Sequence, residues 1–350
     1  MIRKKIRILH VSNSDQFSGA ENVVCQIINM FRNDDDIEMA YACMDGQIRE
    51  ALAEREIPYF PMTHLCNKEL RRVIRDYTPD IIHAHDIRAT VLASLFHKKV
   101  KLISTIHGND VSMRSLSLKA VLFRVAARKM HHIFWVSKSC VEQYYFRKFI
   151  LSKSSVLINV VDRDELVLKM QADPNDYHYD IVYLGRLTAQ KEPLRLAKVL
   201  ALAAARKQDI QAAIIGSGEL EDSMKAKLKE LGIEQNVRFL GFQSNPLKIL
   251  HDAKVMVMTS AWEGTPMCAL EAMAFGVPIV STPTDGLRDL VLDGKTGYLS
   301  DNNHILAERM IQVLQDPLLH ASLSAGTDER FSEISDVRGY KQKLKETYCR

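Results

Sequence analysis

The feature that most constrains the fold is a repeated alternation of short apolar segments and amphipathic segments along most of the chain. The first apolar segment is residues 6–11, and a polar turn at residues 12–19 follows it. Apolar side chains then recur at helical spacing, at Ala20, Val23, Val24, Ile27, Ile28 and Phe31, which predicts an amphipathic helix. Strands that alternate with helices are typical of a parallel sheet covered by helices on both faces, so the predicted fold class is α/β.

The alternation occurs in two series. In the first, strands are predicted at residues 6–11, 37–43, 80–85, 100–106, 133–136 and 156–158, with helices at 47–56 and 111–130 among them. In the second, strands are predicted at residues 181–184, 210–215, 237–240, 255–258, 278–281 and 294–299. The stretch 163–179 between the series is polar, contains Pro174 and has no clear period, so it is predicted to be a linker. We therefore expect two Rossmann-like domains, at residues 1–165 and 178–334.

The composition fits this organisation. A chain of 350 residues with 47% apolar and 26% charged residues is typical of a soluble globular protein with two domains. No window of about 18 apolar residues occurs, so no transmembrane helix is expected. The basic start at residues 1–5 leads into a short strand, which does not resemble a signal peptide. Six scattered cysteines indicate reduced thiols in a cytoplasmic protein.

The stretch 260–278 carries the most specific chemistry. Two carboxylates, Glu263 and Glu271, are eight residues apart, which is a little over two helical turns, so both can face one crevice. Gly264, Thr265 and Pro266 form a turn, and a helix begins after it. Its first N–H groups, those of Met267, Cys268 and Ala269, are expected to form an anion site. An anion site beside two acceptors for sugar hydroxyls indicates a sugar nucleotide, although an ordinary strand–turn–helix with surface glutamates fits the spacing equally well.

Two further groups follow predicted strands. Arg186 and Lys191 lie between a strand and a helix, where they can form a clamp for an anion, or can be two solvated surface charges. His107 follows another strand, at the edge where open α/β sheets bind ligands. A lone histidine is structural as often as functional. His83 and His85 share one strand face, but no third metal ligand is evident, so they are interpreted as structural or acceptor-side groups.

The sequence from Glu263 to Glu271 resembles the glutamate-x7-glutamate motif of retaining glycosyltransferases of family 4. Residues 185–191 match that family's diphosphate-binding segment, and His107–Gly108 matches a His-Gly that faces the donor sugar. The resemblance covers almost the whole chain and implies a GT-B architecture, in which two Rossmann-like domains face each other across a cleft. It also implies that the last helix, at about residues 335–350, returns to the N-terminal domain.

The resemblance implies retaining transfer of a sugar from a nucleotide sugar, expected to be UDP-linked, to a glycan or lipid-linked acceptor in surface polysaccharide synthesis. The N-terminal domain would bind the acceptor and the C-terminal domain the donor. The catalytic residues implied are His107, Arg186, Lys191 and Glu263. The donor-binding residues implied are Gly19, Arg186, Lys191, Gly216, Phe242, Glu263, Gly264, Thr265, Pro266, Met267, Cys268 and Glu271. Gly19 lies in a loop where this chain has Ser18 in place of the family's first glycine, so close backbone approach is not assured there.

No metal or other cofactor is expected, because the cationic clamp and the helix N-terminus can stabilise a diphosphate. The sequence Asp162-Arg163-Asp164 has the form of a D-x-D metal motif. It stands where the family has a turn at the domain junction, so the metal interpretation is rejected. Two alternatives stay open: a nucleotide-sugar 2-epimerase of the same architecture, and a non-catalytic glycosyltransferase-like subunit.

One charge pattern points to a further partner. Residues 98–153 contain 12 Lys/Arg and two acidic residues, a net charge of +10, which favours an anionic partner surface. Within it, residues 114–132 alternate basic and apolar side chains, as a helix on an anionic membrane does. Equally, the apolar residues can simply pack on the sheet. Nucleic acid is not favoured, because no nucleic-acid-binding pattern accompanies the charge.

Overall fold

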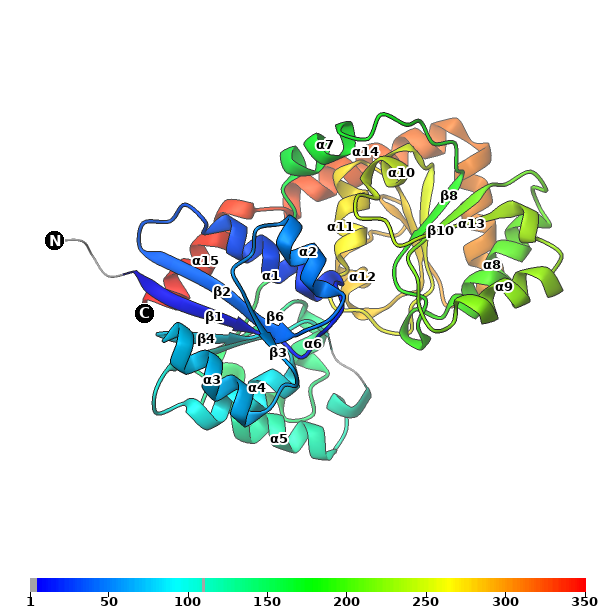
Figure 1. Cartoon of the computed structure of the whole chain (residues 1–350). Helices are drawn as coiled ribbons and strands as arrows, with labels where there is room; N and C mark the ends of the chain where they lie inside the picture. The colour runs from blue at the N-terminus through cyan, green and yellow to red at the C-terminus, as the bar shows by residue number, and fades with distance from the viewer. Residues whose placement is uncertain (1–4, 109–110) are drawn as a thin grey trace. The chain divides into compact units, whose positions relative to one another are not determined.

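A computed structural model describes residues 5–108 and 111–350, and the chain forms two compact units. Unit 1 comprises residues 1–159 and 338–350, and unit 2 comprises residues 160–337 (Figure 1). Most of the basic start and Asp110, which entered the charge count above, lie outside the described residues. None of the helices in the described part combines the length and apolarity needed to cross a membrane.

Unit 1 is built on a seven-stranded parallel sheet with the order β3-β2-β1-β4-β5-β6-β7. Its strands are β1 (Ile6–Val11), β2 (Ile37–Met44), β3 (Tyr59–Met62), β4 (Ile81–Ala84), β5 (Lys101–Ile106), β6 (His132–Trp135) and β7 (Ser154–Val156). Its helices are α1 (Gly19–Met30), α2 (Ile48–Glu54), α3 (Asn67–Tyr77), α4 (Ile87–Ala93), α5 (Leu118–Ala127), α6 (Lys138–Glu142) and α15 (Val337–Cys349). The order reverses direction between β1 and β4, which is the switch point where such sheets bind ligands.

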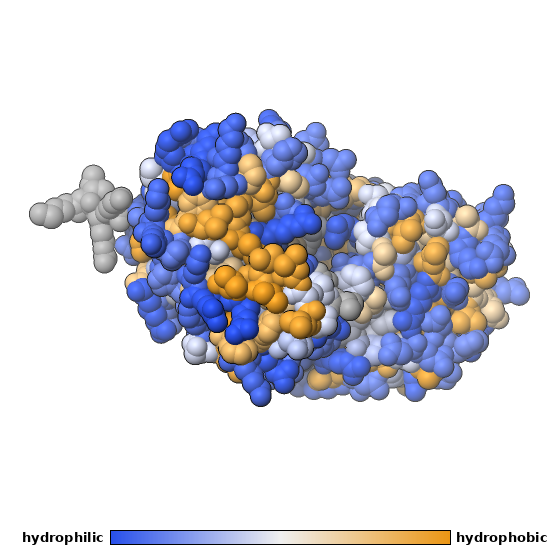
Figure 2. Space-filling view, turned by 90° about the horizontal axis from the view of Figure 1, so that it is seen from below, coloured by the Kyte–Doolittle hydropathy of each residue, from blue (hydrophilic) through white to orange (hydrophobic). Residues whose placement is uncertain are grey.

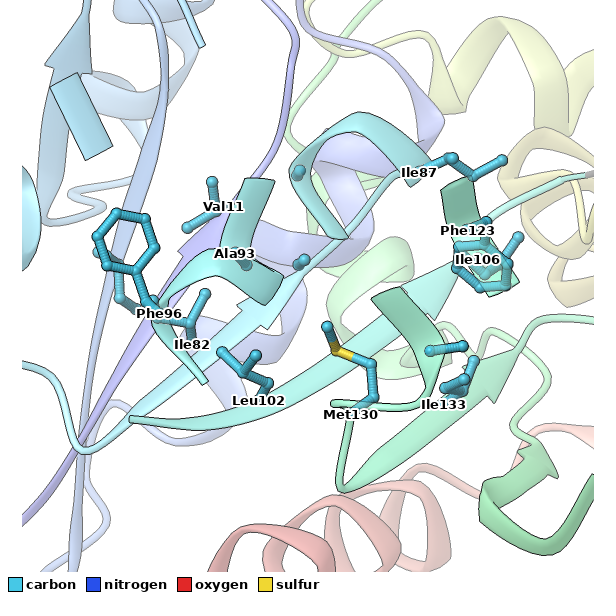
Figure 3. Packing of buried hydrophobic residues seen from close by; sticks show 14 of the residues in the cluster. Val11, Ile82, Ile87, Ala93, Phe96, Leu102, Ile106, Phe123, Met130 and Ile133 are labelled. Carbon is cyan, nitrogen blue, oxygen red and sulfur yellow. The ribbon is translucent and has the colours of Figure 1, made fainter. Parts of the chain in front are cut away.

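The helices of unit 1 cover both faces of its sheet, with α3, α4 and α5 on one face and α1 and α15 on the other (Figure 1). Figure 3 shows the first of these layers, where Val11 and Ile82 of adjacent strands lie near Phe96 at one end and Phe123 lies near Ile106 at the other. Parallel strands pair residues of the same orientation, so alternate residues of β1 and β4 enter this core while their neighbours face the opposite layer.

Helix α15, at the end of the chain, belongs to unit 1. Lys345 forms an ion pair of 2.8 Å with Asp34, and the Lys101 ammonium donates to the carbonyl of Thr347 at 2.7 Å. The Tyr348 hydroxyl lies 2.9 Å from Nδ1 of His83, under the sheet. These contacts tie the last helix to strands that lie more than two hundred residues earlier in the sequence.

Unit 2 has a six-stranded parallel sheet with the order β10-β9-β8-β11-β12-β13. Its strands are β8 (Ile181–Leu184), β9 (Ala212–Ile215), β10 (Val237–Gly241), β11 (Val255–Met258), β12 (Ile279–Ser281) and β13 (Gly297–Leu299). Its helices are α7 (Arg163–Gln171), α8 (Pro193–Ala204), α9 (Glu221–Glu230), α10 (Leu247–Asp252), α11 (Met267–Ala274), α12 (Asp285–Leu290), α13 (Asn303–Gln315) and α14 (Pro317–Ile334). Its switch point lies between β8 and β11.

The structure corrects three local expectations. The stretch predicted as a linker begins with helix α7, whose N-terminus is capped by the Asp162 carboxylate. The single helix predicted at residues 111–130 is instead a short 3-10 turn at Val111–Met113 and then α5, which Ser117 caps. Strand β3 and helix α3 were not predicted. The edge strand β3 contains a proline and has no clear alternation. Helix α3 is largely charged, but its buried Leu70, Val73 and Tyr77 recur at helical spacing, so a signal for this helix was present in the sequence.

Candidate active site

The switch point of the unit 2 sheet brings together the two segments that the sequence singled out. The loop after β8 carries Lys191, and the loop after β11 leads to Glu263. Backbone contacts join them: the N–H of Ala261 donates to the carbonyl of Gln190 at 2.8 Å, and the Gln190 amide donates to the carbonyl of Trp262 at 2.9 Å. The two loops therefore form one structure, although about 70 residues separate them in the sequence.

A buried ion pair lies at the centre of this structure. The ammonium of Lys191 lies 2.5 Å from Oε1 of Glu263, and the two side chains are only 14% and 6% exposed. Ser260 donates its hydroxyl to the same carboxylate oxygen at 2.6 Å. Burial alone lowers the pKa of Lys191, but the adjacent Glu263 carboxylate outweighs it and the pKa is raised. The Lys191 ammonium is therefore charged at neutral pH, and it is oriented by Glu263.

Arg186 is the second predicted cation, and its environment is different. It follows β8, and its side chain is exposed. Its backbone carbonyl accepts from the Tyr183 hydroxyl at 2.9 Å, which holds the main chain of the loop. Within residues 5–108 and 111–350 no carboxylate forms an ion pair with its guanidinium. Arg186 is thus a cation available for an external anion, next to a Lys191 that is already paired.

Helix α11 starts directly after Glu263 and Pro266. Its cap residue, Pro266, has no side-chain hydrogen bond to offer. The sequence predicted three available N–H groups here, and this was wrong for one of them. The N–H of Ala269 donates to the carbonyl of Pro266 at 3.2 Å, because the first turn is tight. In the described part of the chain, the N–H groups of Met267 and Cys268 are left for a ligand.

Helix α12 supports the turn before α11 from behind. A Cβ placed on Gly286 would lie 1.3 Å from the carbonyl oxygen of Gly264, so only glycine allows this approach. Gly286 was not predicted from the sequence, and neither were Ser260 and Gln190 as residues that support Glu263. A glycine just after a predicted strand, in Thr284-Asp285-Gly286, was the available signal for the first of these.

Glu271 lies on the second turn of α11. Burial raises its pKa from 4.5 to about 7, against an opposing effect of the nearby Lys169 ammonium. A partly buried carboxylate without a strong cationic partner is poorly solvated, and it gains most from a ligand that donates hydrogen bonds. Burial also raises the pKa of Cys268 to about 12, so this thiol stays protonated and is not a nucleophile.

We expect Glu271→Gln to stabilise the fold in alkaline solution. The folded pKa of this acid is raised, so the wild type loses stability as the pH rises from the unfolded value toward about 7. The variant has no charge to bury, and its advantage should grow from near zero at pH 5 to about 2 kcal/mol at pH 8. Thermal unfolding of both proteins from pH 5 to pH 8 measures this difference in stability. The exposed Glu219→Gln is the control, and an equal advantage at both pH values would contradict the assignment.

Two other predicted donor-side residues also lie at the carboxyl edge of this sheet. Gly216 follows β9 with φ of 122°, and a Cβ there would lie 2.1 Å from the carbonyl oxygen of Gly185. Its N–H donates to the carbonyl of Gly241 at 2.8 Å, at the end of β10. Phe242 follows Gly241, and its side chain is 63% exposed. The loops after β8, β9 and β10 are thus packed together through glycines.

Unit 1 has its own group of residues at the switch point. His10 on β1 pairs in register with His83 on β4, and His85 follows two residues later on the same face. Nδ1 of His10 lies 2.8 Å from Nε2 of His85, and Nδ1 of His85 lies 3.0 Å from Nε2 of His107. Burial lowers the pKa of all four rings, to about 4 for His107, so they are neutral at pH 7.

The sequence offered no third partner for His83 and His85, but the structure places His10 beside them. One ring nitrogen from each of the three residues lies within 4.8 Å of the other two. All six ring nitrogens of these residues already have a hydrogen-bonding partner in the structure: those of His83 contact Tyr348 and Thr105, and His10 also contacts Met39. The arrangement is a hydrogen-bonded cluster. His10 could not be found by local spacing, because its proximity depends on β1 pairing with β4.

The glycine loop of unit 1 leads directly into helix α1. Gly19 is the first residue of α1, and Ser18 is its cap in an extended conformation. The Ser18 hydroxyl donates to Glu21 at 2.5 Å, and Glu21 is buried. The Ser18 side chain therefore holds the Glu21 carboxylate in the first turn of α1.

Comparisons with known proteins agree with this architecture. Residues 17–165 match the family model "Glycosyltransferase Family 4", and residues 168–330 match "Glycosyl transferases group 1". A lipopolysaccharide 1,6-galactosyltransferase of Salmonella typhimurium is 27% identical over 94% of this chain and 95% of its own length. An Escherichia coli enzyme named UDP-Gal:alpha-D-GlcNAc-diphosphoundecaprenol alpha-1,3-galactosyltransferase is 24% identical, over 90% of each chain.

Among solved structures, the Anabaena protein Alr3699/HepE, crystallised with UDP-glucose, superposes with a TM-score of 0.81. It is 21% identical, and the match covers 98% of this chain and 99% of that one. The fold of the chain is therefore of the GT-B class. With both of its halves matched, the chain belongs to glycosyltransferase family 4.

Proposed function

We propose that the protein transfers a sugar from a UDP-sugar, with retention of configuration, to a glycan or lipid-linked acceptor in surface polysaccharide synthesis. The observation that carries the proposal is the Lys191–Glu263 pair beside the N-terminus of α11, with Arg186 available next to it. Two relatives named as galactosyltransferases act on lipopolysaccharide or on a diphosphoundecaprenol-linked sugar, and a structural neighbour holds UDP-glucose. These names support the donor and acceptor classes.

In this proposal each group has a distinct role. Arg186 and the N–H groups of Met267 and Cys268 stabilise the charge that develops on the leaving diphosphate. Glu271 accepts hydrogen bonds from the ribose hydroxyls, which compensates its buried charge. Glu263 orients the donor sugar, and Lys191 holds Glu263 and adds positive potential. Gly216 and the backbone near Phe242 line the site of the base. His107 of unit 1 contacts the sugar or the acceptor.

No protein nucleophile is assigned. The Cys268 thiol is protonated, and Glu263 is already bound by Lys191 and Ser260. We therefore infer a reaction at one face of the sugar. The bond between the anomeric carbon and the diphosphate breaks, and its electron pair leaves with the diphosphate. The acceptor oxygen bonds to the anomeric carbon on that same face, and a diphosphate oxygen takes the proton of the acceptor hydroxyl.

The test is a panel of nucleotide sugars, screened first by thermal shift and then by transfer to lipid-linked and oligosaccharide acceptors. NMR of the product reports the anomeric configuration, and an inverted product would refute the mechanism. Two alternatives have their own signatures. An epimer that appears without any acceptor would show a 2-epimerase, and a lack of both binding and turnover would favour a non-catalytic subunit.

We expect transfer to be independent of divalent metal. The positive groups around the diphosphate site come from Arg186, Lys191 and the start of α11, and Asp162 of the D-x-D sequence caps α7. Turnover should therefore be unchanged within about twofold by EDTA, because these groups can supply the charge stabilisation. If EDTA abolishes turnover and magnesium or manganese restores it, the assignment is wrong.

We further propose that unit 1 binds an anionic membrane through α5. The inner side of this helix packs on the core through Ala120, Phe123, Ala126 and Ala127. Its outer side exposes a second apolar row, which consists of Leu118, Val121, Leu122 and Val125 and is 37% to 76% exposed. The expectation that all apolar residues of this segment pack on the sheet is therefore wrong for this row.

The surroundings of the row extend the apolar surface. Leu116, Phe149 and Leu151 are also more than half exposed, and Figure 2 shows a broad apolar area on this side of the chain. Arg124 lies over the Phe149 ring at 3.9 Å, and Lys119, Arg128 and Lys129 flank the row on the same helix and just after it. An apolar face with a basic rim suits insertion among anionic headgroups.

The membrane proposal predicts co-sedimentation with anionic vesicles at low salt. Replacing Lys119, Arg128 and Lys129 with serine should weaken binding by about 1 kcal/mol per residue. Leu118→Gln with Leu122→Gln should weaken it by loss of apolar burial. Serine at Arg206 and Lys229 of unit 2 is the matched control. Equal binding to neutral and anionic vesicles, or no change in either set of variants, would reject the proposal.

A further inference from the structure

The four clustered histidines of unit 1, which are His10, His83, His85 and His107, include a chain of hydrogen bonds with a defined beginning. His107, His85 and His10 follow one another through contacts of 3.0 and 2.8 Å, and the last free nitrogen, Nε2 of His10, lies 3.4 Å from the Sδ atom of Met39. Met39 is on β2, where its neighbour in register is Ile8, two residues before His10 on the same face. Both His10 and Met39 are buried.

The sulfur atom gives the chain a direction. A neutral imidazole has one nitrogen that donates and one that accepts, whereas a thioether can only accept. The contact with Met39 is a hydrogen bond only if Nε2 of His10 carries the proton. Nδ1 of His10 must then accept from Nε2 of His85, and Nδ1 of His85 must accept from Nε2 of His107.

We infer that Met39, His10 and His85 are positioning residues that hold His107 in the tautomer protonated on Nε2, with its acceptor lone pair on Nδ1. The reverse direction would leave the lone pair of Nε2 of His10 buried against sulfur without a donor. The direction in which each ring donates from Nε2 has one weak hydrogen bond more than the reverse direction. It is therefore preferred roughly fivefold.

His83 does not compete for this assignment. Its ring nitrogens contact the hydroxyls of Thr105 and Tyr348 at 2.8 and 2.9 Å, and hydroxyls can both donate and accept. Its ring stacks on that of His85, with the centroids 4.3 Å apart. It therefore fills the space beside the chain without fixing a proton in it.

The consequence for chemistry rests on the proposed function. A His107 whose lone pair is on Nδ1 can accept a hydrogen bond from a hydroxyl of the sugar or the acceptor through that atom, and cannot donate one from it. Met39 would thus determine which ring nitrogen of His107 accepts from a substrate hydroxyl, although Met39 itself does not contact the substrate. Its effect passes through the rings of His10 and His85.

The experiment is NMR of the whole chain with isotope-labelled histidine, in spectra that show which ring nitrogen carries the proton. The His107 signals are identified by their loss in His107→Gln. We expect His107 and His85 to be protonated on Nε2 in the wild type. Met39→Leu conserves volume but removes the acceptor, and it should move the His107 signals toward an average of both tautomers. Met62→Leu, at another buried methionine of the same sheet, should leave them unchanged.

A proton on Nδ1 of His107 in the wild type would overturn the inference, and so would unchanged His107 signals in Met39→Leu. Transfer is measured on the same samples. With the tautomer as inferred, Met39→Leu should lower kcat/KM roughly twofold, in line with the loss of a fivefold preference. Absence of any transferase activity in the wild type would refute the proposed function and would leave the tautomer result intact.

Discussion

Replacing Arg186 with alanine is expected to lower kcat/KM for sugar transfer by about 100- to 1,000-fold. The guanidinium is exposed and has no ion pair in the described part of the chain, so its positive charge is available to the leaving diphosphate. Removal of one fixed group that stabilises developing charge typically costs this much. Steady-state kinetics with the donor identified by the screen gives the measurement.

Arg186→Lys is the informative companion. A lysine keeps the charge but cannot make the two parallel hydrogen bonds of a guanidinium with a diphosphate, so most of the loss should persist. Thermal stability should be nearly unchanged in both variants, because the side chain is exposed and only its backbone carbonyl bonds to Tyr183. Near-wild-type kcat/KM in Arg186→Ala, at donor concentrations below KM, would show that the diphosphate is held elsewhere.

Replacing Lys191 with methionine is expected to affect both stability and transfer. The variant leaves the Glu263 carboxylate buried, with the Ser260 hydroxyl as its remaining hydrogen-bond donor in the described part of the chain. Loss of one partner of a buried ion pair typically destabilises by about 3–5 kcal/mol. Calorimetry should show a lower melting temperature for the transition of unit 2, and kinetics should show loss of transfer.

The double variant Lys191→Met with Glu263→Gln separates the two effects. It removes both charges and keeps an acceptor for Ser260, so most of the lost stability should return. Transfer should stay low, because neither the oriented carboxylate nor the positive potential is restored. If Lys191→Met alone has the melting temperature of the wild type, Lys191 does not stabilise the buried Glu263 carboxylate. The electrostatic description of the site is then wrong.

The sequence by itself determined the local elements and the chemistry of the donor side. Strand and helix periods were readable because each apolar segment buries one face, and Arg186, Lys191, Glu263 and Glu271 follow predicted strands of the second series. A parallel sheet brings the ends of its strands to one edge, so this order along the chain was enough to predict a common site.

Three elements, β3, α3 and α7, were not predicted from the sequence. Strand β3 has a proline at the sheet edge, and α3 is held by three buried side chains among charged ones. The polarity of α7 concealed a helix whose start depends on one cap, Asp162. In β3 and α7 a small apolar contribution is completed by neighbours that are distant in the sequence, and local propensity does not reveal those neighbours. In α3 the three buried residues recur at helical spacing, so this helix was readable from the sequence.

Only the tertiary structure decided which strands are neighbours, and the detailed chemistry follows from that. The pairing of β8 with β11 turns a predicted cation and a predicted carboxylate into a buried ion pair. The pairing of β1 with β4 and with β2 places His10 between His85 and Met39. The physical reason is that strand order arises from long-range pairing and burial, whereas sequence periods report only which face of each element is buried.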